Sequence, residues 1–152
     1  MAKSFWLMKS EPDVYSIQDL EKDGKTHWEG VRNYQARNNM QKMSIGDVVL
    51  FYHSRQDPPG VAGIAEVVTE AYPDHYAFDK RSKYFDAKSD KDKPRWFMVD
   101  VAHVETFPEV VSLRHIKDTR SMSEMVLVNN SRLSVQPVRK SEFDRIVKWG
   151  RG

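Results

Sequence analysis

The sequence contains no cysteine among its 152 residues, so disulfide bonds, thiolate-bound zinc, iron–sulfur clusters and cysteine nucleophiles are excluded. It also has no apolar run close to the roughly 20 residues that a membrane-spanning helix requires. Lys9 interrupts the apolar start of the chain before a secretory signal can form. With 39% hydrophobic and 30% charged residues, the composition is typical of a soluble globular protein, which we expect in the cytoplasm.

Several motifs of enzymes are missing as well. The seven glycines are scattered, and neither GxGxxG nor GxxxxGK occurs. No two of the five histidines lie within four residues of each other, so no local metal-binding pair is present. His53 and Ser54 are adjacent at the end of a predicted strand and would point to opposite faces, which disfavours a nucleophile and its base. We therefore expect no metal, no cofactor and no catalytic residue, with a nucleotide-processing enzyme that uses His53 as the alternative.

The overall charge has little excess of one sign. Lysine and arginine total 24 against 22 acidic residues, and the net charge of +2 is too small to hold a duplex by phosphate neutralisation alone. Seven basic residues nevertheless gather near Tyr84, Phe85 and Trp96: Lys80, Arg81, Lys83, Lys88, Lys91, Lys93 and Arg95. This segment is either a solvated loop or a rim that attracts phosphates around a base-stacking pocket.

Hydrophobic patterning predicts more strands than long helices. Strands are expected at 5–8, 48–53, 61–72, 95–107 and 132–138. Pro137 places the last of these near a sheet edge, because proline cannot donate a ladder hydrogen bond. The segment 73–94 has no clear period and is expected to be an ordered loop with one turn of helix.

Helix signals are local and short. Ser16 and Asn33 are expected N-caps of two helices that end near Gly24 and Gly46, and Ser141 is the expected cap of a terminal helix. Short helical segments are also predicted at 112–116 and 123–128. Because most strands follow one another without an intervening helix, we predict an α+β fold. It would be a strongly bent, mostly antiparallel β-barrel with short flanking helices, in one domain over residues 1–152.

The strongest local constellation begins at Trp28 and continues through Gly30 into the helix capped by Asn33. A flat aromatic ring can stack on a base, while amide and backbone groups can bind its hydrogen-bonding edge. The alternative is that Trp28 belongs to the core and the amides decorate a surface helix. If the ring is only a pocket wall, Trp28→Ala should abolish base binding and leave the melting temperature within a few degrees.

Other candidates fit the same kind of pocket. Lys9 and Ser10 follow the first predicted strand, where backbone groups are free to meet a ligand. The run Tyr52–Ser54 ends a buried strand, as a site at a barrel mouth would. Trp96 could stand opposite Trp28, and Ser134 could close the pocket from the edge strand. Each of these positions could also serve the fold alone.

Six segments in this order make the chain similar to the EVE domain family. They are Trp6–Pro12, Trp28–Arg37, Gly46–Ser54, Gly63–Val67, Pro94–Val101 and Arg132–Val138. Together they extend over nearly the whole chain, and the run Trp-Glu-Gly-Val-Arg-Asn-Tyr at 28–34 is the most specific of them. The resemblance implies a PUA-like fold, related to the YTH readers of methylated adenine and to the ASCH domain.

The resemblance also implies a function. The expected partner is nucleic acid with modified bases, in particular 5-methylcytosine in DNA, bound by flipping the base into an aromatic pocket. DNA is favoured over RNA, and an RNA-binding module is the remaining alternative. The expected protein is a monomer with no membrane contact. It would lie in the nucleoid of a bacterial cell or in the nucleus of a eukaryotic one.

The pocket that this implies has an expected set of residues, with Trp28 as one stacking wall and either Tyr84 or Trp96 as the other. The expected base-binding residues are Lys9, Ser10, Trp28, Gly30, Val31, Asn33, Tyr52, His53, Ser54, Tyr84, Trp96 and Ser134. The expected phosphate contacts are Arg32, Arg37, Lys83, Lys93 and Arg95.

Overall fold

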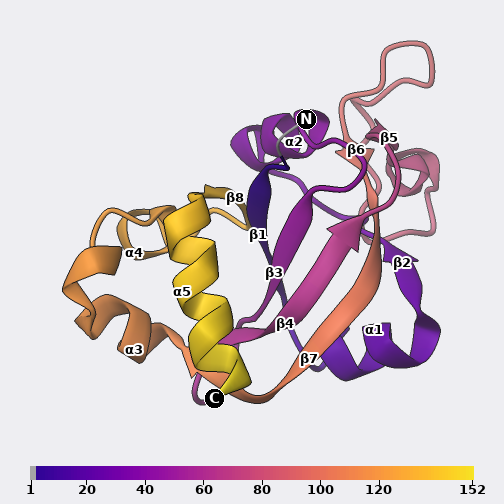
Figure 1. Cartoon of the computed structure of the whole chain (residues 1–152). Helices are drawn as coiled ribbons and strands as arrows, with labels where there is room; N and C mark the ends of the chain where they lie inside the picture. The colour runs from indigo at the N-terminus through magenta and orange to yellow at the C-terminus, as the bar shows by residue number, and fades with distance from the viewer. Residues whose placement is uncertain (1–2) are drawn as a thin grey trace.

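A six-stranded sheet with the order β2-β7-β4-β3-β1-β8 forms the centre of the protein, which a computed structural model describes over residues 3–152. Its strands are β1 (Phe5–Ser10), β2 (Lys25–His27), β3 (Val48–His53), β4 (Gly60–Val67), β7 (Asp100–Ser112) and β8 (Val135–Val138). Two further strands, β5 (Tyr72–Pro73) and β6 (Phe97–Met98), pair only with each other. Figure 1 shows the long loop between them projecting from one end of the main sheet.

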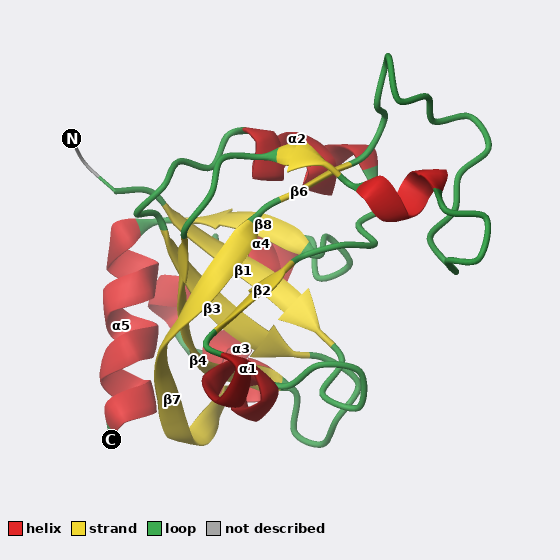
Figure 2. Cartoon of the chain, turned by 90° about the vertical axis from the view of Figure 1, so that its right-hand side faces the viewer, coloured by secondary structure: helices red, strands yellow, loops and turns green. Residues whose placement is uncertain are grey.

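The sheet is mixed and strongly curled, as Figure 2 shows. β1 pairs with β3 in parallel, and the other neighbours are antiparallel. The parallel pair requires a crossover connection between β1 and β3. This connection contains helix α1 (Ile17–Asp23), strand β2 and helix α2 (Tyr34–Gln41). The pairing of β4 with β7 shifts register between Val61 and Gly63 and again between Ile64 and Ala65, and such bulges increase strand twist. The prediction of a strongly bent, mostly antiparallel sheet is confirmed.

Helices are short and lie at the ends and on one side of the sheet (Figure 1). They are α1 (Ile17–Asp23), α2 (Tyr34–Gln41), α3 (Leu113–Asp118), α4 (Val126–Asn129) and α5 (Lys140–Arg151), with 3-10 turns η1 (His75–Phe78) and η2 (Arg120–Met122). Ser16 and Asn33 are the N-caps of α1 and α2, as predicted, and Gly24 ends α1. The helical turn predicted within 73–94 is η1.

Side-chain alternation along the strands divides the core between the two faces of the sheet. Trp6 and Met8 of β1 join one apolar cluster, which also contains Trp28 and residues of α1 and α2. Leu7, between them, joins a second cluster with Ile146 of α5. Because successive side chains in a strand point to opposite faces, both faces of β1 and β3 are buried. The sheet therefore holds α5 on one face and the Trp28 segment on the other.

Several predicted boundaries are wrong. β2 was not predicted, because a three-residue edge strand of polar residues has no apolar alternation. The strand predicted at 61–72 ends at Val67, and the strand predicted at 95–107 is divided at Val99 and continues to Ser112. The carbonyl of Val99 accepts a hydrogen bond from the Trp28 N–H at 2.9 Å instead of continuing a ladder.

Three ends of elements also differ from prediction. α5 begins after Arg139 rather than at Ser141, because the Glu142 carboxylate accepts the Arg139 backbone N–H at 2.9 Å. α2 ends at Gln41, earlier than the end predicted near Gly46. Lys9 and Ser10 are the last residues of β1 rather than the first residues after it, and they pair with Tyr52 and His53.

Candidate nucleic-acid interface

A cavity of about 380 Å³ lies where the end of β1, the segment after β2 and the loop 74–96 meet. Its volume is within the range of about 300–1,000 Å³ that is typical of small-ligand sites. It is lined by Lys9, Ser10, Glu11, Val14, Tyr15, Thr26, His27, Trp28, Glu29, Gly30, Val31, Arg32, Lys83, Tyr84 and Ser134. The cavity is thus assembled from four segments that are far apart in the sequence.

Trp28 lines the cavity and is at the same time part of the core. Its side chain is 9% exposed and packs edge-to-face on Phe51 at 5.4 Å between ring centroids. The indole N–H groups of Trp6 and Trp96 donate to aspartate carboxylates at 3.0 and 2.7 Å. Trp28 thus combines core packing with a place in the cavity lining.

Tyr84 is the second aromatic residue of the cavity, and it approaches through the space above Gly30. Gly30 has φ +85°, and a Cβ at this position would lie 2.5 Å from the Tyr84 ring. Only glycine both adopts this backbone conformation readily and leaves room for the ring. The glycine of the Trp28 segment therefore brings the loop 74–96 against the cavity.

Asp74 joins the loop to the Trp28 segment. Its fully buried carboxylate accepts hydrogen bonds from the Gly30 N–H at 2.8 Å, the Tyr76 N–H at 3.0 Å and Arg32 at 3.0 Å. The Arg32 guanidinium also donates to the Tyr84 carbonyl at 2.6 and 3.1 Å. One buried carboxylate and one arginine thus position the backbone on both sides of the cavity.

The ends of β1 and β8 form the floor of the cavity. The Lys9 backbone N–H donates to the Ser134 carbonyl at 2.9 Å, and the Lys9 ammonium donates to the Ser131 carbonyl. Burial lowers the pKa of Lys9 from its ordinary value. The Ser10 hydroxyl donates to the Tyr15 carbonyl at 2.5 Å. These side chains shape the cavity, but their donors are used within the protein.

The structure brings seven of the twelve predicted base-binding residues to the cavity: Lys9, Ser10, Trp28, Gly30, Val31, Tyr84 and Ser134. The other five do not line it: Asn33, Tyr52, His53, Ser54 and Trp96. Of the predicted phosphate contacts, Arg32 and Lys83 line the cavity.

Three of the residues away from the cavity serve helices and strands. The Asn33 side chain caps α2 by accepting the Ala36 N–H at 2.9 Å. Tyr52 is buried beneath Lys9, and burial raises the pKa of its phenol to about 12. The Ser54 N–H donates to the Ser10 carbonyl at 2.9 Å.

His53 is 4% exposed, and its imidazole accepts the backbone N–H of Ile17 at 3.0 Å. This hydrogen bond satisfies a donor at the start of α1 that has no partner within the helix. Burial lowers the pKa of His53, which favours the neutral form that can accept. The lone pair that a catalytic base would use is therefore engaged in the fold.

Trp96 is 6% exposed and stacks on Tyr34 at 4.9 Å between ring centroids. Its indole N–H donates to Asp86 at 2.7 Å. The side chain thus joins α2 to the base of the loop. Of the two aromatics expected to face Trp28, Tyr84 is the one that lines the cavity.

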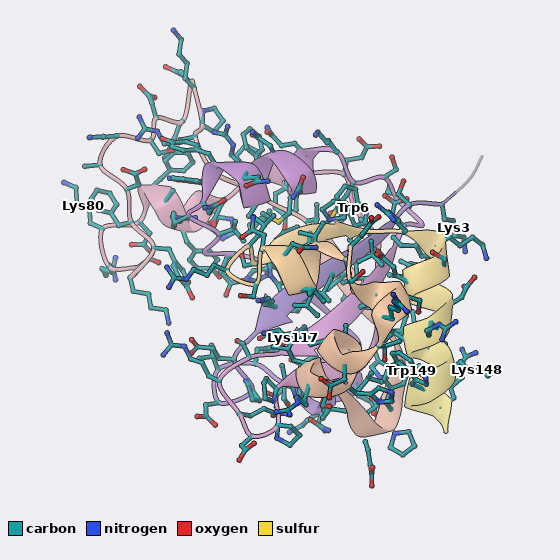
Figure 3. The ribbon with its side chains drawn as sticks, turned by 90° about the vertical axis from the view of Figure 1, so that its left-hand side faces the viewer. Lys3, Trp6, Lys80, Lys117, Lys148 and Trp149 are labelled. Atoms are coloured by element: carbon teal, nitrogen blue, oxygen red, sulfur yellow. The ribbon has the colours of Figure 1, made fainter. Side chains whose placement is uncertain are left out.

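The remaining basic candidates differ in whether their charged groups have partners within the protein. The Arg37 guanidinium donates to the Arg95 carbonyl at 2.8 Å, and Arg95 lies 3.8 Å from Asp86. Lys83 and Lys93 are exposed, and the Lys83 ammonium lies 5.1 Å from the centre of the Tyr84 ring. In Figure 3, Lys80 marks this loop on the opposite side of the molecule from Lys148 and Trp149 of α5.

Six cavity residues were not predicted: Glu11, Val14, Tyr15, Thr26, His27 and Glu29. Glu11 and Glu29 lie within the motifs that carry the family resemblance, so their position beside Lys9–Ser10 and Trp28 was a usable signal. The other four unpredicted residues had no such signal in the sequence, because β2 and the turn before α1 were not predicted to reach the site. Within residues 3–152 there is no cluster of three or more potential metal ligands, and no helix there is long and apolar enough to cross a membrane.

Comparisons with known proteins agree with one another. The family model of the EVE domain matches residues 4–149. Human thymocyte nuclear protein 1 is 40% identical over 163 residues, which cover 95% of this chain and 72% of that protein.

Two solved structures illustrate the likeness in three dimensions. A hypothetical protein from Leishmania major has a TM-score of 0.95 at 51% identity, with 98% of this chain and 95% of that chain covered. The human THYN1 protein in complex with 5-methylcytosine-containing DNA has a TM-score of 0.93 at 39% identity, with 99% of each chain covered.

Proposed function

The chain belongs to the EVE domain family, and from that premise we propose that it is a non-catalytic binder of DNA that contains a modified cytosine, with 5-methylcytosine as the base bound. Its curled half-barrel with short flanking helices is the PUA-like fold. The observation that carries the proposal is the cavity of about 380 Å³ with Trp28 and Tyr84 in its lining. The human relative in complex with 5-methylcytosine-containing DNA supports it.

The shape of the site favours a base that has left the helical stack. The cavity has aromatic residues on three of its four segments, Tyr15, Trp28 and Tyr84 among them, and its volume of about 380 Å³ suits a single base. Extruding a base from a duplex costs a few kcal/mol. We therefore expect single-stranded or mismatched sites to bind more tightly than intact duplex.

Affinity for the polymer would come from the exposed lysines of the loop 74–96. Arg32, Arg37 and Arg95 have protein partners, whereas Lys83 and Lys93 are exposed on the loop, and Lys83 lines the cavity. A lysine near the entrance can bind the phosphate next to a flipped base. The protein would act as a monomer in the compartment that holds DNA, the nucleoid or the nucleus.

The engagement of His53 argues against the nucleotide-processing alternative. Its imidazole accepts the Ile17 N–H and is 4% exposed, so it has no free lone pair facing the cavity. DNA is preferred to RNA as the partner because the structure of the human relative contains DNA.

A matched pair of tyrosine variants tests the proposal. Tyr84 and Tyr34 both have an arginine near the ring, but only Tyr84 lines the cavity. Tyr84→Ala should weaken binding of a single-stranded oligonucleotide with one 5-methylcytosine by about 5- to 150-fold, the usual contribution of one stacking partner. Tyr34→Ala should leave the affinity within about twofold, because Tyr34 is outside the lining.

Fluorescence anisotropy of the labelled oligonucleotide measures both affinities. The proposal is contradicted if the wild-type protein does not prefer the methylated oligonucleotide to an unmethylated one. Equal effects of the two variants would show that the DNA lies elsewhere on the surface.

A further inference from the structure

Any site for 5-methylcytosine faces a competitor that is present in all DNA. Thymine has the same six-membered ring and the same methyl group at C5. The two bases differ at position 4, where 5-methylcytosine has an amino donor and thymine a carbonyl acceptor, and at N3, where the roles are reversed. Stacking and methyl contacts therefore cannot separate them, and a polar group near position 4 must do so.

The cationic groups of the cavity cannot easily supply that distinction. The Lys9 ammonium donates to the Ser131 carbonyl, and the Arg32 guanidinium donates to Asp74 and to the Tyr84 carbonyl. A free cation would in any case favour the thymine carbonyl. Lys83, the third cation of the lining, has its ammonium 5.1 Å from the centre of the Tyr84 ring, so the distinction between the two bases has to come from an acceptor.

Two carboxylates line the cavity, and their surroundings differ. Glu11 forms an ion pair with Arg55 at 2.8 Å. Glu29 follows the Trp28 wall directly, and its side chain is 33% exposed. Its ion-pair partner among residues 3–152 is His27, whose Nε2 lies 3.4 Å from one carboxylate oxygen.

His27 is itself held in place, which limits the positions open to Glu29. Its ring stacks on Tyr76 at 5.6 Å between centroids, and its Nε2 lies 3.2 Å from the Tyr76 hydroxyl. Tyr76 belongs to η1, next to Asp74, which also accepts the Gly30 N–H. The carboxylate thus stands beside the stacking wall with an oxygen still able to accept a hydrogen bond.

We propose that Glu29 is the specificity-determining residue of the site, accepting a hydrogen bond from the exocyclic amino group of the flipped cytosine. This inference depends on the proposed function of the cavity. A carboxylate that accepts from cytosine N4 is an established pairing in base recognition. Thymine would place its carbonyl oxygen against the same carboxylate, and two acceptors without a shared proton repel each other.

Three single-stranded oligonucleotides that differ at one position separate these contributions. The position contains 5-methylcytosine, thymine, or 5-methylpyrimidin-2-one, which keeps the ring and methyl group but has neither amino nor carbonyl at position 4. The wild-type protein should prefer 5-methylcytosine to thymine by about 5- to 150-fold. The base without a substituent at position 4 should bind with intermediate affinity.

Glu29→Gln provides the test, and Glu21→Gln is the matched control. The glutamine amide can turn its NH₂ toward the thymine carbonyl, so Glu29→Gln should reduce the preference over thymine to about threefold or less, while thymine binding is retained or improved. Glu21 also has a histidine beside it, with His103 Nε2 at 3.6 Å, but it lies outside the cavity lining, so Glu21→Gln should keep the wild-type preference. Thermal melting of both variants, with expected values close to wild type, separates this effect from loss of fold.

The outcomes distinguish the two proposals. An unchanged preference in Glu29→Gln, or an equal loss in Glu21→Gln, overturns the role of Glu29 and leaves the cavity as the DNA site. If the wild-type protein binds 5-methylcytosine and thymine equally, the role of Glu29 is also overturned. If it binds none of the three oligonucleotides, both proposals fail.

Discussion

Trp28 and Tyr84, two of the aromatic residues that line the cavity, are supported in different ways. Trp28 is 9% exposed, packs on Phe51 and belongs to the apolar cluster on one face of the sheet. Tyr84 is half-buried on the loop 74–96, which Asp74 and Arg32 attach to the Trp28 segment by hydrogen bonds. Core packing therefore holds Trp28 in place, whereas a few polar contacts hold Tyr84.

Because of this difference, a substitution at Trp28 affects both stability and binding, whereas a substitution at Tyr84 affects mainly binding. A change at Trp28 alters the core as well as the cavity, so lost affinity there does not by itself identify a ligand contact. A change at Tyr84 or at its supports leaves the sheet intact. The loop is therefore the part of the site in which specificity can vary without loss of the fold.

The largest effect is expected from Trp28→Ala. Truncating a tryptophan in a packed core costs about 3–5 kcal/mol, whereas Tyr84→Ala should cost less than about 1 kcal/mol because its ring packs on a loop. The burial of Trp28 corrects the expectation from sequence that its truncation would leave the melting temperature nearly unchanged. Urea unfolding of both variants measures the two losses of unfolding free energy. Equal losses would show that Tyr84 contributes as much to the fold as Trp28 does.

Asp74→Asn tests the attachment of the loop. The new NH₂ group would face at least one of the three donors that the carboxylate now accepts, at a cost of about 1–3 kcal/mol. Asp79→Asn is the control, because Asp79 is exposed and, within residues 3–152, its carboxylate accepts only the Arg81 N–H. We expect faster amide exchange in the loop and weaker DNA binding for Asp74→Asn alone. Unchanged exchange would mean that other contacts hold the loop.

Gly30→Ala tests the contact between the two walls and has an internal control. Gly30 and Gly24 both have φ +85°, but a Cβ would meet the Tyr84 ring only at Gly30 and meets nothing within 4 Å at Gly24. Each alanine should cost about 1–2 kcal/mol through the backbone alone. Only Gly30→Ala should also displace Tyr84 and reduce affinity for the methylated oligonucleotide. Similar affinities for the two variants would show that Tyr84 does not contact the base.

The smallest effect is expected from Lys83→Gln. If its ammonium binds a phosphate, the slope of log affinity against log salt should fall by about 1, with no change in unfolding free energy. Lys117→Gln on α3 changes the net charge equally at a residue outside the cavity lining and should keep the wild-type slope. The comparison fails if both variants change the slope by the same amount.

Local signals were enough to predict much of the framework. The caps at Ser16 and Asn33 and the buried strand β3 follow from side chains that act within a few residues of themselves. Pro137 correctly indicated an edge, since β8 is the last strand of the sheet. The bent sheet and the Trp28 constellation also followed from the order of the strands and from local residue types, and the family resemblance added the PUA-like fold and the modified base as ligand.

The remaining features depend on partners that are distant in sequence. Tyr84 and Trp96 are similar as local signals, and contacts with Gly30 on one side and with Tyr34 and Asp86 on the other determine which of them reaches the cavity. Asp74 accepts hydrogen bonds from the nearby Tyr76 and from Gly30 and Arg32, which are more than 40 residues away, and no local pattern predicts these distant partners.

The four separate segments of the cavity make ligand binding a property of the finished fold. Its lining includes residues from Lys9 to Ser134, so a peptide that contains only the Trp28 motif would not bind. An unfolded chain would have no site at all, and the ligand would therefore bind only the native state. By mass action, an oligonucleotide at 100 times its dissociation constant would raise the unfolding free energy by about 2.7 kcal/mol. A thermal shift could then identify the preferred base without labelling either molecule.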